Sequence, residues 1–174
     1  MQVTEWSTGG SSPAGLSVAS TLNVLVSCCD SPLLRMYTPL GCPVCEISVQ
    51  RPGLVGLVHG LQLDSGWFVV IGVTEAGDRQ ACVHRNDHDL PDLLDSSGSP
   101  AYLAMVGGDD GSYVWLAERC TGAGVRMLQV PATSCSAKLP AVELEDPEKM
   151  CWNENSQRLY IVQNGRVKIC RVHM

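Results

Sequence analysis

The stretch that decides the fold runs from Pro13 to Tyr37 and reads PAGLSVASTLNVLVSCCDSPLLRMY. It holds three short apolar runs separated by turn residues, which is the pattern of strands joined by tight connections. Its middle run contains the triplet Val24-Leu25-Val26. Similar triplets return at Phe68-Val69-Val70, Val114-Trp115-Leu116 and Leu159-Tyr160-Ile161, so that their first residues lie 44, 46 and 45 positions apart.

A repeat of about 40–50 residues with several strands in each unit is the signature of a β-propeller. The first unit predicts four strands, over 13–18, 23–27, 34–37 and 44–47. We therefore expect an all-β fold, a partial β-propeller of about four blades, each a short antiparallel sheet of up to four strands. The expected blades span about 13–49, 57–86, 100–130 and 146–173, within a single domain over 1–174.

The later units repeat this arrangement. Strands are expected over 59–63, 67–73 and 81–84, then over 100–105, 113–117 and 125–128, and last over 147–152, 158–162 and 167–170. Asn164-Gly165 indicates a type I′ hairpin. The second strand of each unit is apolar at consecutive positions, which predicts that both of its faces are covered. Residues 88–95 are the best helical candidate, but Pro91 limits them to a short turn, and 87–99 and 132–145 are interpreted as loops.

Composition narrows the function. The apolar content of 45% and charged content of 17% suit a globular chain, and the net charge of −6 disfavours an RNA-binding role because phosphate contacts need an excess of Lys and Arg. The charge is uneven, since residues 75–118 hold nine acids and two Arg, whereas 146–174 hold five bases and three acids. Neither a signal peptide nor a membrane-spanning run is evident, so we expect a cytoplasmic chain whose nine Cys are reduced thiols.

The first unit resembles the NHL repeat. The matching residues are Pro13, Gly15, Leu16 and Val18, the run Asn23–Val26, Asp30, and the run Leu34–Tyr37. The resemblance covers roughly 13–173 and is looser in later units, where Tyr102 and Lys149 stand in place of the Gly. It implies a six-bladed propeller like the one at the C-terminus of tripartite-motif ubiquitin ligases, where it recognises protein or RNA partners and performs no chemistry.

Two departures from that family matter. The chain supplies only about four blades, so we expect an incomplete six-bladed propeller, in which 2–6 resembles the outer strand of a preceding blade. The end faces of such a partial propeller would be apolar, which favours self-association. The alternatives are that the chain is a fragment of a longer product, which the segment 2–6 favours, or that it closes more tightly as a four-bladed ring. The chain also lacks the Cys/His ladder of a RING domain, so ubiquitin-ligase activity is not expected of it.

Several residues resemble pieces of reactive sites. Cys42-Pro43-Val44-Cys45 is a CxxC motif, but no second ligand pair stands at zinc-finger spacing and no helix follows it, so a structural role is favoured. Cys28 and Cys29 are neighbours that should point to opposite faces of a strand. The remaining candidates are histidines: His84 and His88 beside Asp87 and Asp89, interpreted as a strand end and a solvated loop, the structural His59, and the terminal His173.

A metal-dependent lactonase or lyase of propeller type would draw carboxylates, Asn or His from the inner strands of several blades. The inner-strand segments 16–18, 61–63, 103–105 and 150–152 contain no charged residue. Four Trp, at 6, 67, 115 and 152, are interpreted as core rather than a base-stacking platform. Arg35, Arg126 and Lys168 share one repeat position, where solvated charge is favoured over a basic stripe.

These observations predict a non-catalytic scaffold that recognises a protein partner through the rim loops of the propeller, with no cofactor, metal or catalytic residue and no membrane partner. Loops held by a stiff scaffold are free to vary and commonly carry binding. The alternatives are an RNA-binding NHL propeller and, third, a lactonase- or lyase-type enzyme. The sequence does not identify the partner-binding residues.

Overall fold

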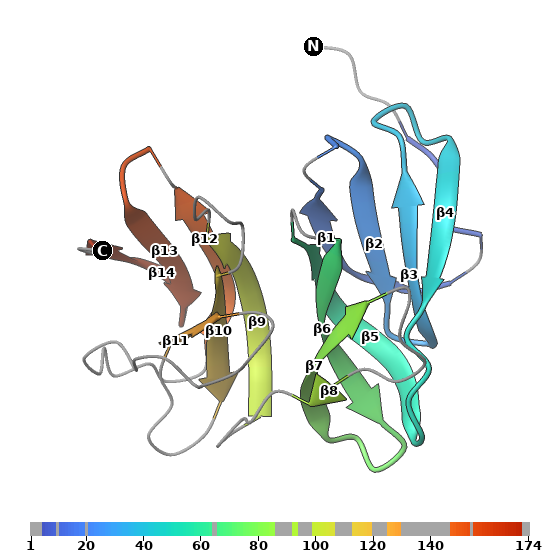
Figure 1. The fold of residues 1–174 in the computed structure, drawn as a ribbon. Helices are drawn as coiled ribbons and strands as arrows, with labels where there is room; N and C mark the ends of the chain where they lie inside the picture. Colours follow the sequence, from blue (N-terminus) through green and yellow to red (C-terminus); the bar gives the residue numbers. More distant parts are fainter. Residues whose placement is uncertain are drawn as a thin grey trace. The chain divides into compact units, whose positions relative to one another are not determined.

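The computed structural model describes residues 5–9, 11–19, 21–63, 66–85, 92–93, 99–106, 113–119, 125–129, 147–153 and 155–171. Within these residues all regular structure is β-strand, arranged in four antiparallel sheets of consecutive strands (Figure 1). Contacts divide the chain into two compact units, Met1–Leu93 and Leu94–Met174, each with two of the sheets. The expectation of a single domain stays a prediction.

The first sheet is the predicted four-stranded blade. Its strands follow one another in chain order: β1 (Pro13–Val18), β2 (Val24–Cys28), β3 (Ser31–Tyr37) and β4 (Pro43–Ser48). Leu16 pairs with Val26, Val26 with Arg35, and Arg35 with Glu46, so these four side chains share one face of the sheet.

The second sheet differs from prediction at both of its ends. It contains β5 (Leu54–Gln62), β6 (Trp67–Thr74), β7 (Arg79–Arg85) and β8 (Asp92–Leu93). β5 begins at Leu54, whereas the strand is expected over 59–63 and the blade from about 57, because bulges between Leu54 and Gly56 and between Leu57 and His59 let it keep pairing with β6. The interpretation of 87–99 as loop, with a helical turn at most over 88–95, is wrong at Asp92–Leu93, which form a short strand paired with β7; residues 86–91 and 94–98 lie outside the described part.

The second unit holds two three-stranded sheets. The third sheet contains β9 (Ser99–Val106), β10 (Tyr113–Arg119) and β11 (Val125–Gln129), and the fourth contains β12 (Pro147–Asn153), β13 (Arg158–Gln163) and β14 (Arg166–Arg171). Asn164 and Gly165 join β13 to β14 with φ values of 50° and 68°, which confirms the type I′ turn. The predicted loop over 132–145 lies outside the described residues.

The core of the first unit lies between its two sheets, with β5 in contact with β1, β2 and β3. The first sheet contributes Leu25, Leu34 and Met36 to this core, and the second contributes Phe68 and Val70. Successive residues Phe68, Val69, Val70 and Ile71 are all buried, which confirms that β6 is covered on both faces.

Backbones approach closely where the two sheets meet. The Ser17 hydroxyl donates a hydrogen bond of 2.6 Å to the carbonyl oxygen of Gly60, linking β1 to β5. A Cβ placed on Gly60 would lie 2.5 Å from Leu34 Cδ2, and one on Gly56 would collide with the carbonyl oxygen of Cys29. Glycine is therefore required at Gly56 by the close approach of main chain, whereas a side chain at Gly60 would require Leu34 to shift.

Residues 5–12 cross the other face of the first sheet. The Trp6 ring lies 6.4 Å from the Tyr37 ring, centroid to centroid, and packs on a cluster that contains Val26 and Cys28. The Arg35 guanidinium donates to the Thr8 carbonyl at 2.8 Å and to the Ser11 hydroxyl at 2.6 Å. Of the outer strand expected over 2–6, residues 2–4 lie outside the described part, and Glu5 and Trp6 are not in a strand.

Among the described residues, none forms a helix of the length and apolar character needed to cross a bilayer.

Candidate functional site

The loops at one end of the first unit form what we call the apolar rim: residues 19–23 between β1 and β2, 38–42 between β3 and β4, and the junction between β5 and β6 at Leu63 and Gly66–Trp67. The first two loops lie at the same end of one sheet because its strands are antiparallel neighbours in chain order (Figure 1). Gly15 lies against His59 and Ser17 against Gly60, so β1 and β5 run in the same direction. The junction that follows β5 therefore lies at the same end as the loop that follows β1.

Two leucines stand at the tips of these loops. Leu22 is 71% exposed and Leu40 is 76% exposed. Leu22 has φ = 64°, a left-handed backbone conformation that is rare for a bulky residue. Hydrogen bonds from the Leu22 N–H to the Ala19 carbonyl (2.9 Å) and from the Ala19 N–H to the Asn23 carbonyl (2.8 Å) hold the turn. The turn therefore directs an apolar side chain into solvent at a cost in backbone strain.

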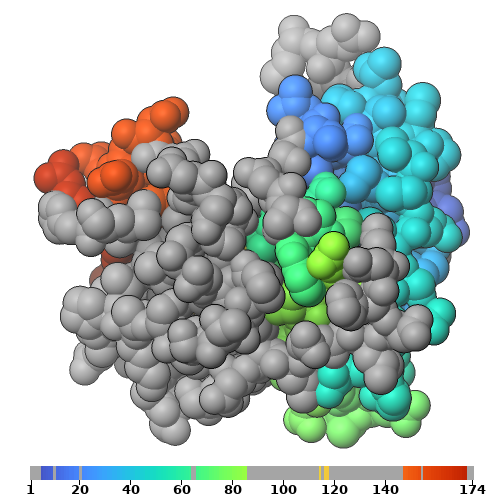
Figure 2. All heavy atoms as spheres, in the orientation of Figure 1, coloured from blue at the N-terminus to red at the C-terminus, as the bar shows by residue number. Residues whose placement is uncertain are grey.

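The loop that carries Leu40 is also fixed by hydrogen bonds. The Thr38 N–H donates to the Cys42 carbonyl at 2.8 Å, and the Gly41 N–H donates to the Thr38 carbonyl at 2.9 Å. Gly41 has φ = 85°, and a Cβ there would lie 2.6 Å from the Trp6 ring. Leu40 is thus presented by a closed turn that packs on Trp6, and this loop projects at the surface in Figure 2, in cyan.

The second sheet adds an aromatic side chain to this rim. Trp67 begins β6 and pairs with Arg85 at the end of β7. The Arg85 guanidinium carbon lies 5.2 Å from the centroid of the Trp67 ring, which is within the range of a cation–π contact. Trp and Arg are the residue types that most often dominate protein–protein binding energy.

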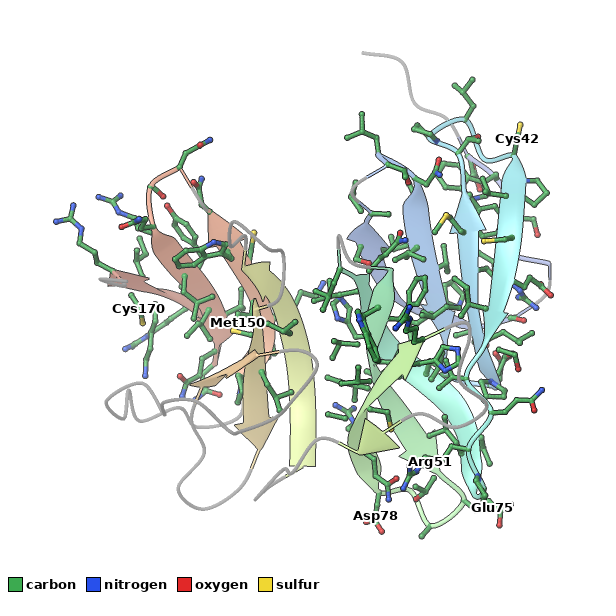
Figure 3. The ribbon with its side chains drawn as sticks, viewed as in Figure 1. Cys42, Arg51, Glu75, Asp78, Met150 and Cys170 are labelled. Carbon is green, nitrogen blue, oxygen red and sulfur yellow. The ribbon has the colours of Figure 1, made fainter. Side chains whose placement is uncertain are left out.

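The opposite end of the first unit has a different character. Its loops, 29–30, 49–53 and 75–78, carry Asp30, Arg51, Glu75 and Asp78, three of which are labelled at the bottom of Figure 3. The Asp78 N–H donates to the Thr74 hydroxyl at 3.2 Å, and the Glu75 N–H donates to the Gly53 carbonyl at 2.9 Å. This charged rim offers no exposed leucine among the described residues, so the two ends would suit different surfaces.

The cysteines do not form a reactive site in the described part of the chain. Cys42 lies in the β3–β4 turn and Cys45 in β4, and both are exposed free thiols. Cys28 is buried whereas Cys29 is exposed, as expected for neighbours on opposite faces, and burial raises the pKa of the Cys28 thiol. Within the described ranges, no three His, Cys, Asp or Glu side chains lie together as metal ligands would.

The histidines divide between core and undescribed regions. His59 lies in β5 with 2% of its surface exposed, and burial lowers its pKa to about 4, partly offset by a hydrogen bond with the backbone of Leu16. His84 is buried in β7. His88, Asp87, Asp89 and His173 lie outside the described residues, so their predicted roles stay predictions.

The basic residues do share the predicted repeat position. Arg35 pairs with Val26, Arg126 with Leu116 and Lys168 with Ile161, which are in each case the third residue of the repeated triplet. Arg35 is not available to a ligand, because its Nε donates to Glu46 Oε1 at 2.9 Å and its Nη1 holds residues 8 and 11. The register is therefore confirmed, but the interpretation as solvated charge is wrong for Arg35, whose side chain is only 16% exposed and is held by these hydrogen bonds.

The other sequence candidates are dispersed. Trp6 packs on the first sheet, Trp67 stands at the apolar rim, Trp152 lies in β12 and Trp115 lies in β10. Glu148 is the sole carboxylate in the four strands that open the sheets, β1, β5, β9 and β12. In the inner-strand segment 16–18, Leu16 and Val18 are exposed.

The four sheets of consecutive antiparallel strands, with a common register and face-to-face packing within the first unit, define a β-propeller class of fold. No known family pattern matches the sequence, and none of the curated proteins matches it. Solved structures, in contrast, are similar to this chain.

Three of them illustrate the similarity. The chain is similar to a structure from a nidogen/laminin complex (TM-score 0.70, 14% identity, covering 91% of this chain and 60% of that one). It is also similar to a gluconolactonase from Xanthomonas campestris (TM-score 0.68, 10% identity, 90% and 57% covered). A third match is the β-propeller domain of Cps50 (Swd1) from Myceliophteria thermophila (TM-score 0.57, 12% identity, 92% and 54% covered).

These comparisons bear on fold alone. The chain is an all-β partial β-propeller of about four blades, and it spans between about half and three fifths of the length of these three structures. The neighbours include an enzyme of lactone chemistry and a protein from a complex, so the fold does not decide between catalysis and binding.

The apolar rim was missed by sequence reasoning. Its signal is present in the segments Ser20-Thr21-Leu22-Asn23 and Pro39-Leu40-Gly41, each of which sets a leucine among turn-forming residues. A large apolar residue within a turn cannot pack on a face of the sheet. The exposure of Leu22 and Leu40 could therefore have been expected from the sequence.

Proposed function

We propose that this protein is a non-catalytic scaffold whose apolar rim recognises a protein partner. The observation that carries the proposal is the pair of leucines at loop tips, Leu22 and Leu40, each more than 70% exposed on loops closed by backbone hydrogen bonds. Scattered exposed leucines are common, but strain at an exposed turn is not. Leu22 has a left-handed backbone that a glycine would adopt more easily.

The chemistry of the rim suits a protein better than a nucleic acid. Two aliphatic tips and the Trp67–Arg85 pair provide the mixture of apolar, aromatic and guanidinium groups typical of binding hot spots. A phosphate-binding surface would instead gather several unpaired cations, and the net charge of the chain is −6. An RNA partner is the second candidate and has less support.

A lactonase- or lyase-type activity also has less support. Such propellers collect metal ligands from the inner strands of several blades, whereas β1, β5, β9 and β12 together supply one carboxylate, Glu148. The similarity to a gluconolactonase is at 10% identity and concerns the backbone.

The finer assignments belong to the same proposal. The first-unit residues Pro13–Tyr37 support an NHL-type propeller, and a cytoplasmic location is part of the same proposal. A six-bladed parent propeller is part of the same proposal and rests on the resemblance of Pro13–Tyr37 to the NHL repeat.

A paired-variant interaction experiment tests the rim. The full chain and the double variant Leu22→Asp/Leu40→Asp are immobilised, and the retained proteins are identified by mass spectrometry with and without nuclease. The control variant is Glu75→Ala/Asp78→Ala on the charged rim. We expect at least one partner that the wild type and control retain, that the leucine variant loses, and that nuclease does not release.

The partner is then purified and its affinity measured by calorimetry. Loss of two exposed apolar anchors should weaken binding by about tenfold or more. Circular dichroism and thermal melting verify that the variants are folded. A partner lost only by the charged-rim variant would contradict the assignment of the rim, and partners released by nuclease would favour the RNA alternative.

A further inference from the structure

One face of the first sheet is left partly uncovered. Leu16 and Val18 in β1 are 61% and 58% exposed. They pair with Val26 and Val24, so they lie on the face that does not pack against the second sheet. Residues 5–12 cover the Tyr37 side of this face through Trp6, which leaves the β1 side open.

In the fourth sheet, the uncovered face is the one that corresponds in the repeat to the core-facing side of the first sheet. Val167 and Ile169 in β14 are 61% and 59% exposed. They pair with Val162 and Tyr160 in β13. In the repeat, Tyr160 and Val162 correspond to Leu25 and Ser27, whose β3 partners are Met36 and Leu34.

This correspondence indicates which kind of contact the exposed face of the fourth sheet would make. Leu34 and Met36 are buried against the second sheet of the first unit. Val167 and Ile169 occupy the equivalent positions of the last sheet and have no such cover. The last sheet therefore presents the half of a sheet–sheet interface that the first sheet uses internally, and the first sheet presents the complementary half.

The charges of the two faces differ. Lys149, Arg158 and Arg171 share the face of Tyr160 and Ile169 in the fourth sheet, and Glu148 stands in the bulge beside Lys149. On the first sheet, Glu46 shares the face of Leu16 but is paired with Arg35 on that same face, and exposed Glu5 precedes Trp6 on the segment that crosses it. The face with more basic than acidic groups would meet one with more acidic than basic groups, which favours this pairing over two fourth-sheet faces.

We propose that two copies of this chain associate head to tail, with the β12–β13–β14 face of one copy packed on the β1–β2 face of the other. This inference does not depend on the proposed recognition of another protein by the apolar rim, because it uses different residues. The contact would repeat the packing that joins the first and second sheets. It is heterologous, so each copy uses two different surfaces.

The internal interface predicts one specific contact. Ser17 meets Gly60 across the first and second sheets. In the repeat Ser17 corresponds to Cys151, since they pair with Leu25 and Tyr160, and Gly60 corresponds to Leu16, since they pair with Val70 and Val26. Cys151 is an exposed free thiol, so it should lie next to Leu16 of the second copy.

Complementary variants test the association. Val167→Asp/Ile169→Asp blocks one face and Leu16→Asp/Val18→Asp blocks the other, with Leu40→Asp as an exposed-leucine control. Light scattering after gel filtration should show the wild type and control above the 18.7 kDa monomer mass, and each blocked variant at that mass. An equimolar mixture of the two blocked variants should recover a dimer, because each retains the face that the other lacks.

Crosslinking tests the register. Under mild oxidation Leu16→Cys should form an intermolecular disulfide with Cys151, identified by peptide mapping, and adding Cys151→Ser should abolish it. Val55→Cys is the control at another exposed position. Circular dichroism confirms folding of each variant. The proposal is overturned if the wild type is monomeric at millimolar concentration, if the mixture of blocked variants does not dimerise, or if the crosslink joins position 16 to its own counterpart.

Discussion

His59 makes the stability of this protein depend on pH. The side chain lies in β5 with 2% exposure, and burial lowers its pKa from 6.5 to about 4. The folded state therefore favours the neutral imidazole, whereas the unfolded chain takes up a proton as the pH falls below 6.5. The contribution of His59 is complete above pH 6.5 and is lost progressively between pH 6.5 and about 4.

The magnitude follows from the same two values. A pKa difference of about 2.5 units corresponds to about 3 kcal/mol once the pH is below 4. At pH 5 the loss relative to pH 7.5 should be about 2 kcal/mol. That loss is a sizeable part of the 5–15 kcal/mol by which a typical domain is stable, roughly an eighth to two fifths of it.

The assay is urea unfolding followed by Trp fluorescence at half-unit steps from pH 4 to 8. The variant His59→Gln removes the titrating group, so its free energy of unfolding should fall about 2 kcal/mol less than that of the wild type between pH 7.5 and 5. Other titrating groups contribute to both proteins and cancel in this difference, as does any constant cost of the substitution. Parallel curves for the two proteins would refute the argument that burial of His59 suppresses its protonation.

Two further substitutions test how the first unit is held together. Gly60→Ala would place a Cβ 2.5 Å from Leu34 Cδ2, so it should destabilise the fold by about 1–3 kcal/mol in chemical denaturation, and an unchanged midpoint would contradict the close approach of the two sheets. Arg35→Met removes the donors to Thr8, Ser11 and Glu46, so it should cost about 1–3 kcal/mol and expose residues 5–12 to limited proteolysis, whereas cleavage at an unchanged rate would show that other contacts hold this segment.

The regular part of the fold could be predicted from the sequence because the same pattern of strands is repeated four times. The triplets that start at Val24, Phe68, Val114 and Leu159 fall at equivalent places in four second strands, and the register confirms the columns that follow them. The Asn164-Gly165 turn was also predictable, because few other residue pairs adopt positive φ twice in succession.

The rest depended on contacts that no local pattern encodes. Asp92–Leu93 becomes a strand because it pairs with Cys82 and Val83, although its neighbours in sequence suggest a loop. The proposed site of binding was missed for a related reason. Leu22 looks like an ordinary apolar residue until its backbone conformation and its exposure are known.

The collision that a Cβ on Gly56 would make with the Cys29 carbonyl has a mechanical consequence. Where main chain touches main chain, no side chain can change rotamer to let one layer slide over the other. The two layers of the first unit should therefore resist shear and move as one body. A ligand that engages Leu22 and Trp67 together would meet a spacing set by the scaffold, and it would spend little entropy on ordering these loops.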